Sequence, residues 1–162
     1  MNIQERIAFL VEKLRLIPHP EGGFFSETYR SDASIDTNSG KRNLITAIYF
    51  LLTSENVSKF HRIKSDELWF FHEGSKLTVH TLSDLGHQQL SLGFPSNTDK
   101  SLPQHLVTAN TIFGSTVDEP DSYALVSCVV APGFDFVDFE LFEEKVLLAK
   151  YPDASEIIKK LT

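Results

Sequence analysis

The chain has 162 residues, enough for one domain that buries roughly 70% of its unfolded surface without disulfides or a structural metal. Hydrophobic residues make up 41% and charged residues 23%, as in an ordinary soluble globular protein. The formal net charge of −7 argues against nucleic acid or an acidic membrane as a partner, because such polyanions are bound through Lys and Arg. The 13 Phe residues indicate an interior lined by aromatic rings.

The N-terminal residues lack the basic and then apolar order of a signal peptide. No apolar run reaches the ~18 residues that a membrane span requires. We therefore expect a cytoplasmic protein with no membrane partner. The single cysteine, Cys128, lies in an apolar run and is expected to be a small core residue rather than a reactive thiol.

The first predicted element is a helix over about residues 3–15. Its apolar residues recur at helical spacing, and Asn2 and Glu5 have the spacing of a capping box. The helix is expected to end before Pro18, since a proline disfavours the helical conformation in the residue that precedes it. A glycine pair then allows a tight turn into a strand over residues 24–30.

Residues 31–42 are polar and show no apolar periodicity, so we expect a mobile loop there. From residue 44 onward, short β-rich runs are separated by turn signals, a pattern typical of an antiparallel sandwich or barrel. No helical segment long enough for a βαβ crossover interrupts these runs, which disfavours a parallel α/β fold. The predicted strands cover residues 44–53, 59–64, 67–73, 76–82, 87–92, 104–108, 111–117 and 122–131.

After the last of these strands, residues 134–142 alternate aromatic and acidic side chains. This pattern indicates a final edge strand or an extended segment that covers a hydrophobic face. Asp153 and Glu156 again have capping-box spacing and precede an apolar stripe, so a short C-terminal helix is expected over about residues 153–161. The chain is thus predicted to be one domain over residues 1–162.

The residues that point to chemistry lie in two successive predicted strands. His61 shares a face with Ile63 in the first strand, and Glu67 shares a face with Trp69 and Phe71 in the second. If both faces look into a barrel, His61 and Glu67 can meet in an aromatic-lined cavity. Such a pair could supply two metal ligands, a general base oriented by its partner, or a polar anchor for a small ligand.

The spacing of these residues resembles the first motif of the cupins, in which H-x-H is followed after three or four residues by E and after six more by G. Here His61 is followed by Ile63 in place of the second histidine, and then by Glu67 and Gly74. The second cupin motif, P-x-G-x-x-H, has a degraded counterpart that ends in Phe113 where the pattern has a histidine. Two of the four ligands are missing, so we expect no metal cofactor.

Further segments look like the cupin subfamily called cupin-5, a domain of unknown function, over about residues 14–142. These segments are His19–Gly23 with Glu27–Arg30, Ser58–Gly74, and Ala131–Phe136 with Phe139–Glu140. The resemblance implies a mainly all-β fold, a cupin-type antiparallel β-barrel or jelly roll over about residues 24–142, with short terminal helices. It also implies a homodimer, because cupins generally associate through their sheets, and residues 134–142 are a candidate interface.

The candidate catalytic residues are His61 and Glu67 as the polar centre and Tyr29 as an acid or hydrogen-bond donor. Arg30 could hold an anionic ligand, and the aromatic candidates would form the pocket walls. His72 is out of phase with Glu67 and reaches the pocket only if a β-bulge reverses it. The full set of ligand-binding candidates is Arg30, Trp69, Phe71, Phe113, His72 and His19.

The leading interpretation is a protein that binds a small molecule in this pocket, with enzyme status open. One alternative is a metal-independent isomerase or epimerase for a sugar- or keto-type substrate. A second is a metal-dependent cupin enzyme that uses His61, Glu67 and one unexpected ligand. A third is a structural or regulatory dimer with a vestigial pocket. The remaining histidines, His80, His87 and His105, are expected to be ordinary surface or sheet residues.

Overall fold

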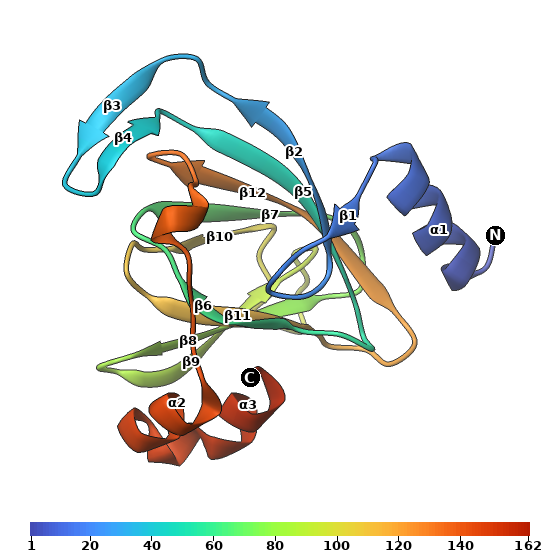
Figure 1. Cartoon of the computed structure of the whole chain (residues 1–162). Helices are drawn as coiled ribbons and strands as arrows, with labels where there is room; N and C mark the ends of the chain where they lie inside the picture. Colours follow the sequence, from blue (N-terminus) through green and yellow to red (C-terminus); the bar gives the residue numbers. More distant parts are fainter.

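The structure is a computed structural model that describes residues 1–162, and two antiparallel sheets form its barrel (Figure 1). The six-stranded sheet has the order β1 (Ile17–Pro18), β2 (Phe24–Arg30), β5 (Thr46–Thr53), β12 (Tyr123–Ala131), β7 (Asp66–Gly74) and β10 (Gln104–Val107). The five-stranded sheet has the order β13 (Glu140–Leu141), β6 (Ser58–Arg62), β11 (Ile112–Val117), β8 (Leu77–Ser83) and β9 (Gly86–Leu92). The predicted fold class, a mainly all-β antiparallel barrel, is confirmed.

The main core lies between the two sheets and takes side chains from both. Phe50, Trp69 and Phe113 are its largest fully buried members. Because alternate residues of a strand point to opposite faces, β12 sends Ala124, Val126, Cys128 and Val130 into this core. Cys128 is a buried free thiol, as the sequence predicts.

The helix α1 (Ile3–Lys13) covers part of the outer face of the six-stranded sheet. Its capping box is present, because the Asn2 side chain accepts a hydrogen bond from the backbone of Glu5 and the Glu5 side chain accepts one from the backbone of Asn2. Leu10 packs in a second apolar cluster with Leu51 and Leu125 of the sheet. The helix thereby shields a sheet face that would otherwise expose apolar side chains to water.

The helices α2 (Glu144–Lys150) and α3 (Ser155–Lys160) cover the outer face of the five-stranded sheet (Figure 1, red). Leu147 and Ile158 pack there against Phe60 of β6. The sequence pattern predicts only one C-terminal helix with a cap at Asp153. Instead, α3 begins at Ser155, after a one-turn 3-10 helix, η2 (Pro152–Ala154), and no side chain caps it. None of the three α-helices has the length and apolar character that a membrane-spanning helix requires.

The prediction of a mobile loop over residues 31–42 is wrong. These residues form a hairpin of β3 (Ser34–Thr37) and β4 (Gly40–Asn43) that extends beyond the barrel (Figure 1, pale blue). Most of its side chains are exposed on both faces, so the hairpin has no apolar alternation to reveal it. Arg42 is the exception, because it is buried against Asp138 in a two-point ion pair with its Nε atom 2.7 Å from the carboxylate.

Residues 134–142 are not one continuous strand. They form a second one-turn 3-10 helix, η1 (Phe136–Asp138), and the short edge strand β13. Phe134 and Phe139 pack against the main core. The prediction of a segment that covers a hydrophobic face therefore fits Phe134 and Phe139, and the prediction of an edge strand fits β13.

Gly74, the last residue of the first motif, is required by the fold. Its φ is +97°, and a Cβ atom there would lie 2.1 Å from the carbonyl oxygen of Tyr123. We expect Gly74→Ala to lower the free energy of unfolding by at least about 3 kcal/mol, since it combines backbone strain with a backbone clash. Gly86→Ala is the matched control, because its φ is +81° with nothing within 4 Å of the added Cβ, so about 1 kcal/mol of strain is expected. Urea unfolding of both variants measures the difference, and equal losses would contradict this account.

Candidate functional site

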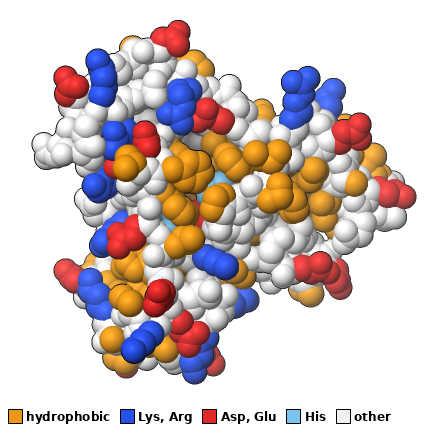
Figure 2. Space-filling model, in the orientation of Figure 1, with side chains coloured by type: hydrophobic (Ala, Val, Ile, Leu, Met, Phe, Trp, Pro, Cys, Tyr) orange, Lys and Arg blue, Asp and Glu red, His pale blue; other side chains and the backbone are white.

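The barrel contains a cavity of about 80 Å³ that lies among β2, β5, β6, β7, β12 and the segment around η1. Hydrophobic side chains gather at the centre of the face in Figure 2, and histidine atoms are visible between them. Half of the lining is apolar, including Phe25, Ile48, Ile63, Val130, Phe134 and Phe136. The titratable lining residues are His19, Glu21, Glu27, Arg30, His61, Glu67 and Cys128.

His61 points inward from β6 and is only 3% exposed. Its Nδ1 atom lies 2.6 Å from the Lys59 carbonyl oxygen, and its Nε2 atom lies 2.8 Å from a carboxylate oxygen of Glu21. Because both neighbours are acceptors, the geometry favours an imidazolium that donates from both nitrogens. The Phe113 ring packs against the imidazole, with 4.2 Å between the ring centroids.

Glu21 also lines the cavity, although it is not among the site residues predicted from the sequence. It lies in the turn between β1 and β2, where Gly22 and Gly23 both have positive φ. A Cβ atom on Gly22 would lie 1.9 Å from the carbonyl oxygen of Val57, so a glycine is needed for this turn to approach the chain before β6. The available signal is the His-Pro-Glu-Gly-Gly segment, which the family resemblance includes.

Glu21 and His61 form a buried ion pair. Burial opposes the charged form of both groups, but the attraction between them outweighs it, so the pKa of His61 lies above its ordinary value and the pKa of Glu21 lies below. His19 accepts a hydrogen bond from the Glu21 backbone through Nδ1, and burial lowers its pKa. The ion pair therefore favours the charged forms of Glu21 and His61, whereas burial favours the neutral form of His19.

Glu67 points into the same cavity from β7 and is 8% exposed. Burial raises its pKa to about 7, although the positive charge of His61 acts in the opposite direction. The thiol of Cys128 lines the same cavity, and burial raises the pKa of this thiol well above its ordinary value. No Lys, Arg or His nitrogen lies within 4.0 Å of its carboxylate. Glu67 is thus a buried carboxyl group without a direct ion-pair partner.

Arg30 lies at the edge of the cavity, but its guanidinium is already engaged. It pairs with Glu27 at 2.6 Å, and it also donates to the side-chain oxygen of Asn43 and the carbonyl oxygen of Phe134. The expected role of Arg30 as an anion holder therefore lacks a free charge. The structure places Tyr29 on the outside, 55% exposed, because a β-bulge between Glu27 and Tyr29 shifts the alternation of β2.

The other candidates lie outside the cavity lining. Trp69 is fully buried in the core, and Phe71 packs edge-on against Phe94. His72 lies on the outer face of β7 and contacts the Ser127 hydroxyl, even though the pairing of β7 with β12 has a register shift at this point. Of the predicted site residues, His61, Glu67, His19 and Arg30 line the cavity. Its apolar walls are formed by other residues than the predicted aromatic ones.

The donor set does not fit the metal of the full cupin pattern. Ile63 and Phe113 stand at two of the four ligand positions, and neither offers a donor atom. The Nε2 atom of His61 faces Glu21, and no group of three or more His, Cys, Asp and Glu side chains is placed to hold a metal ion. We derive no chemistry through a metal.

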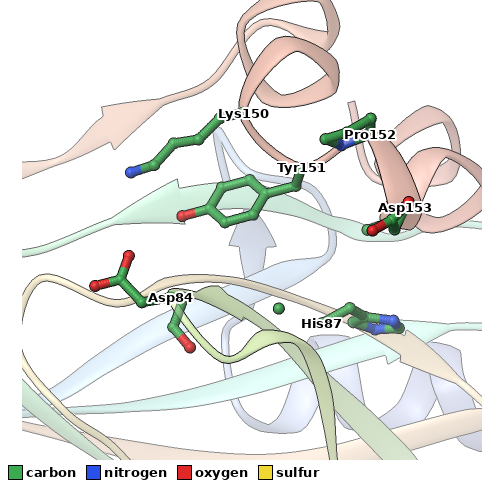
Figure 3. A pocket seen from close by; sticks show the side chains of 9 residues that line it. Asp84, His87, Lys150, Tyr151, Pro152 and Asp153 are labelled. Atoms are coloured by element: carbon green, nitrogen blue, oxygen red, sulfur yellow. The ribbon is translucent and has the colours of Figure 1, made fainter.

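A wider depression of about 630 Å³ lies on another surface, between the β8–β9 turn and the segment that joins α2 to α3. Figure 3 shows Lys150 and Tyr151 on one side of it and Asp84 and His87 on the other. The Nε2 atom of His87 lies 3.0 Å from the Nδ1 atom of His80. His80 is buried, and burial lowers its pKa to about 4. This depression is open and its charged side chains are exposed, so it has no enclosed polar centre.

Two antiparallel sheets around an internal cavity with a polar centre define a cupin-type barrel. The model of the family described as "Cupin superfamily (DUF985)" matches residues 8–142, and the chain belongs to this family. It is 31% identical to the uncharacterized protein YML079W of Saccharomyces cerevisiae, with 80% of this chain and 71% of that protein covered.

Solved structures agree with this assignment. Protein SO0799 from Shewanella oneidensis is 40% identical, with a TM-score of 0.89 over 100% of this chain and 98% of that one. A hypothetical protein from Leishmania major is 37% identical, with a TM-score of 0.86 over 96% and 97%. An oxalate decarboxylase variant from Bacillus subtilis is 12% identical, with a TM-score of 0.56 over 90% of this chain and 37% of that one, a likeness of fold alone.

The raised pKa of Glu67 predicts a pH-dependent stability. Its folded pKa of about 7 exceeds the ordinary 4.5. The contribution of Glu67 to the free energy of unfolding is therefore fully present below pH 4.5 and is lost as the pH rises through about 7. The full loss is about 3 kcal/mol. We expect Glu67→Gln to gain about this much stability relative to wild type between acidic and alkaline pH in urea unfolding. The exposed Glu55→Gln is the control, and parallel pH curves for wild type and Glu67→Gln would contradict the assignment.

Proposed function

We propose that this protein binds a small organic molecule in the cavity lined by His61 and Glu67. The observation that carries the proposal is the buried carboxyl group of Glu67, which faces the cavity without a direct ion-pair partner. A buried carboxyl group is costly unless a partner satisfies it, and a ligand in the cavity would be such a partner. A polar centre inside a largely apolar enclosure is also the usual composition of a ligand pocket.

The geometry supports distinct roles for the lining residues. Glu67 would contact the polar part of the ligand, while Phe25, Phe134 and Phe136 would bury its apolar part. His61 would act through its charge, because both of its nitrogens already have acceptors. A cavity of about 80 Å³ suits a ligand of few heavy atoms, so a whole sugar nucleotide would not be enclosed.

A cavity-filling variant tests this proposal. Ile63 lines the cavity, so Ile63→Phe should abolish the binding of fragments found by NMR and thermal shift with wild type. Ile35→Phe is the matched control, because Ile35 is 45% exposed on the β3–β4 hairpin, and it should bind as wild type does. Circular dichroism checks that both variants are folded.

Chemical-shift changes in wild type provide a second measurement that needs no variant. They should concentrate on the backbone of Glu67 and Cys128. Fragments that bind Ile63→Phe unchanged, or that shift only residues of the β8–β9 depression, would contradict the proposal.

A second candidate function is proton transfer on a keto-type ligand, and the pKa of Glu67 near 7 favours it. A carboxyl group with this pKa is suited to act as both base and acid near neutral pH. On an α-hydroxy ketone, Glu67 would take the proton from the hydroxyl-bearing carbon, the electrons of that C–H bond would form a C=C bond, and the carbonyl π electrons would move to the carbonyl oxygen to give an enediolate. The hydroxyl proton would pass to that oxygen, a new carbonyl would form at the hydroxyl-bearing carbon, and Glu67 would return its proton to the former carbonyl carbon. The positive charge of His61 would stabilise the enolate.

Deuterium exchange separates catalysis from simple binding. A keto compound that binds should incorporate deuterium in D₂O with wild type, and Glu67→Gln should lower this rate by about a hundred-fold or more, as loss of a general base does. Glu55→Gln should exchange at the wild-type rate. Binding without exchange above the buffer rate would eliminate the isomerase and leave the binding function.

The homodimer stays a prediction. Residues 134–142, its candidate interface, place Phe134 against the core and expose Phe136 and Val137 beside the cavity. Association through this segment would therefore cover the cavity opening, and light scattering would measure the mass in solution.

A further inference from the structure

We propose that the ligand of this cavity carries a positively charged ammonium nitrogen that pairs with Glu67. The inference rests on the proposed binding function and adds the chemical class of the ligand. It follows from the charges that line the cavity and from the aromatic side chains beside them.

The charge balance of the cavity leaves one carboxyl group without a partner. Three glutamates line it, and two of them are paired inside the protein, Glu21 with His61 at 2.8 Å and Glu27 with Arg30 at 2.6 Å. The third, Glu67, is more than nine-tenths buried and has no ion-pair partner. No lysine lines the cavity. A ligand cation would complete the balance, because an opposite charge at short range stabilises the ionised carboxylate.

An anionic ligand is disfavoured by the same arrangement. Its charge would approach Glu67, while both cations of the lining already have carboxylate partners. If His61 or Arg30 moved to pair with the ligand, its present partner, Glu21 or Glu27, would lose its ion pair. The structure therefore argues against anionic ligands such as phosphate and carboxylate, which the sequence prediction assigned to Arg30.

The aromatic wall suits a cation with an apolar surface. Phe134 and Phe136 pack edge to face with 4.9 Å between ring centroids, and Phe136 and Phe139 pack in the same manner at 6.0 Å. Phe136 is 52% exposed and lines the cavity. A ring face attracts an ammonium group within about 6 Å, so these rings add a cation–π contribution to the carboxylate.

Four small probes separate the charge classes with the wild-type protein alone. Tetramethylammonium and propylammonium are the cations, tert-butanol is a neutral molecule of similar shape to the first, and propionate is the anion. At constant ionic strength, the ammonium probes should bind about ten-fold more tightly than tert-butanol, and propionate should not bind. NMR titration measures each dissociation constant and locates the probe in the cavity.

Two variants separate the contributions of charge and ring. Glu67→Gln should weaken the ammonium probes about ten-fold and change tert-butanol by less than two-fold, whereas the exposed Glu55→Gln should match wild type. Phe136→Leu should weaken tetramethylammonium several-fold and leave tert-butanol unchanged, because leucine keeps an apolar surface without a ring face.

The outcomes distinguish this inference from the binding function. If tert-butanol binds as tightly as the ammonium probes, or propionate binds more tightly, the ligand is not a cation, although loss of that binding in Ile63→Phe would still support the cavity function. If none of the four probes binds, the ammonium assignment is wrong. Because the probe comparison uses wild type, it remains decisive even if Glu67→Gln does not fold.

Discussion

The ion pair between Glu21 and His61 determines how the rest of the site is arranged. It joins the turn between β1 and β2 to the inward face of β6, so it ties the two sheets together beside the cavity. A backbone hydrogen bond from Lys59 to Glu21, 2.7 Å long, lies next to it. Two charges buried together are tolerated because each satisfies the other, and loss of either would leave an uncompensated charge.

This pair also explains what remains of the metal pattern. In the full cupin pattern, the histidine at position 61 shares a metal with other ligands. In this chain, Phe113 occupies one ligand position and packs on the imidazole, while the Glu21 carboxylate supplies the negative charge that His61 needs. The barrel keeps its shape because a packed ring and an ion pair fill the polar centre, and Glu67 is left as the group that faces the cavity.

The sequence predicts the parts of the fold in which one face of an element is buried. β7 and the second half of β12 alternate buried and less buried residues, so their period is visible. The β3–β4 hairpin and the short helix α2, in contrast, bury a single side chain each. His61 and Glu67 follow from motif spacing. Glu21 does not, since its pairing depends on how a distant turn packs. The outward position of Tyr29 comes from a bulge that no periodicity shows.

The position of β12 in the sheet has a consequence for synthesis of the chain. β12 lies between β5 and β7, although it is the last long strand of the sequence. On the ribosome, β2, β5, β7 and β10 are synthesised before β12, so any pairing of β2 with β5 and of β7 with β10 at that stage leaves open edges on β5 and β7 that can pair with other chains. The nascent protein is therefore most exposed to aggregation just before residue 131 emerges. The cavity is complete only after that point, because Phe134 and Phe136 form part of its wall.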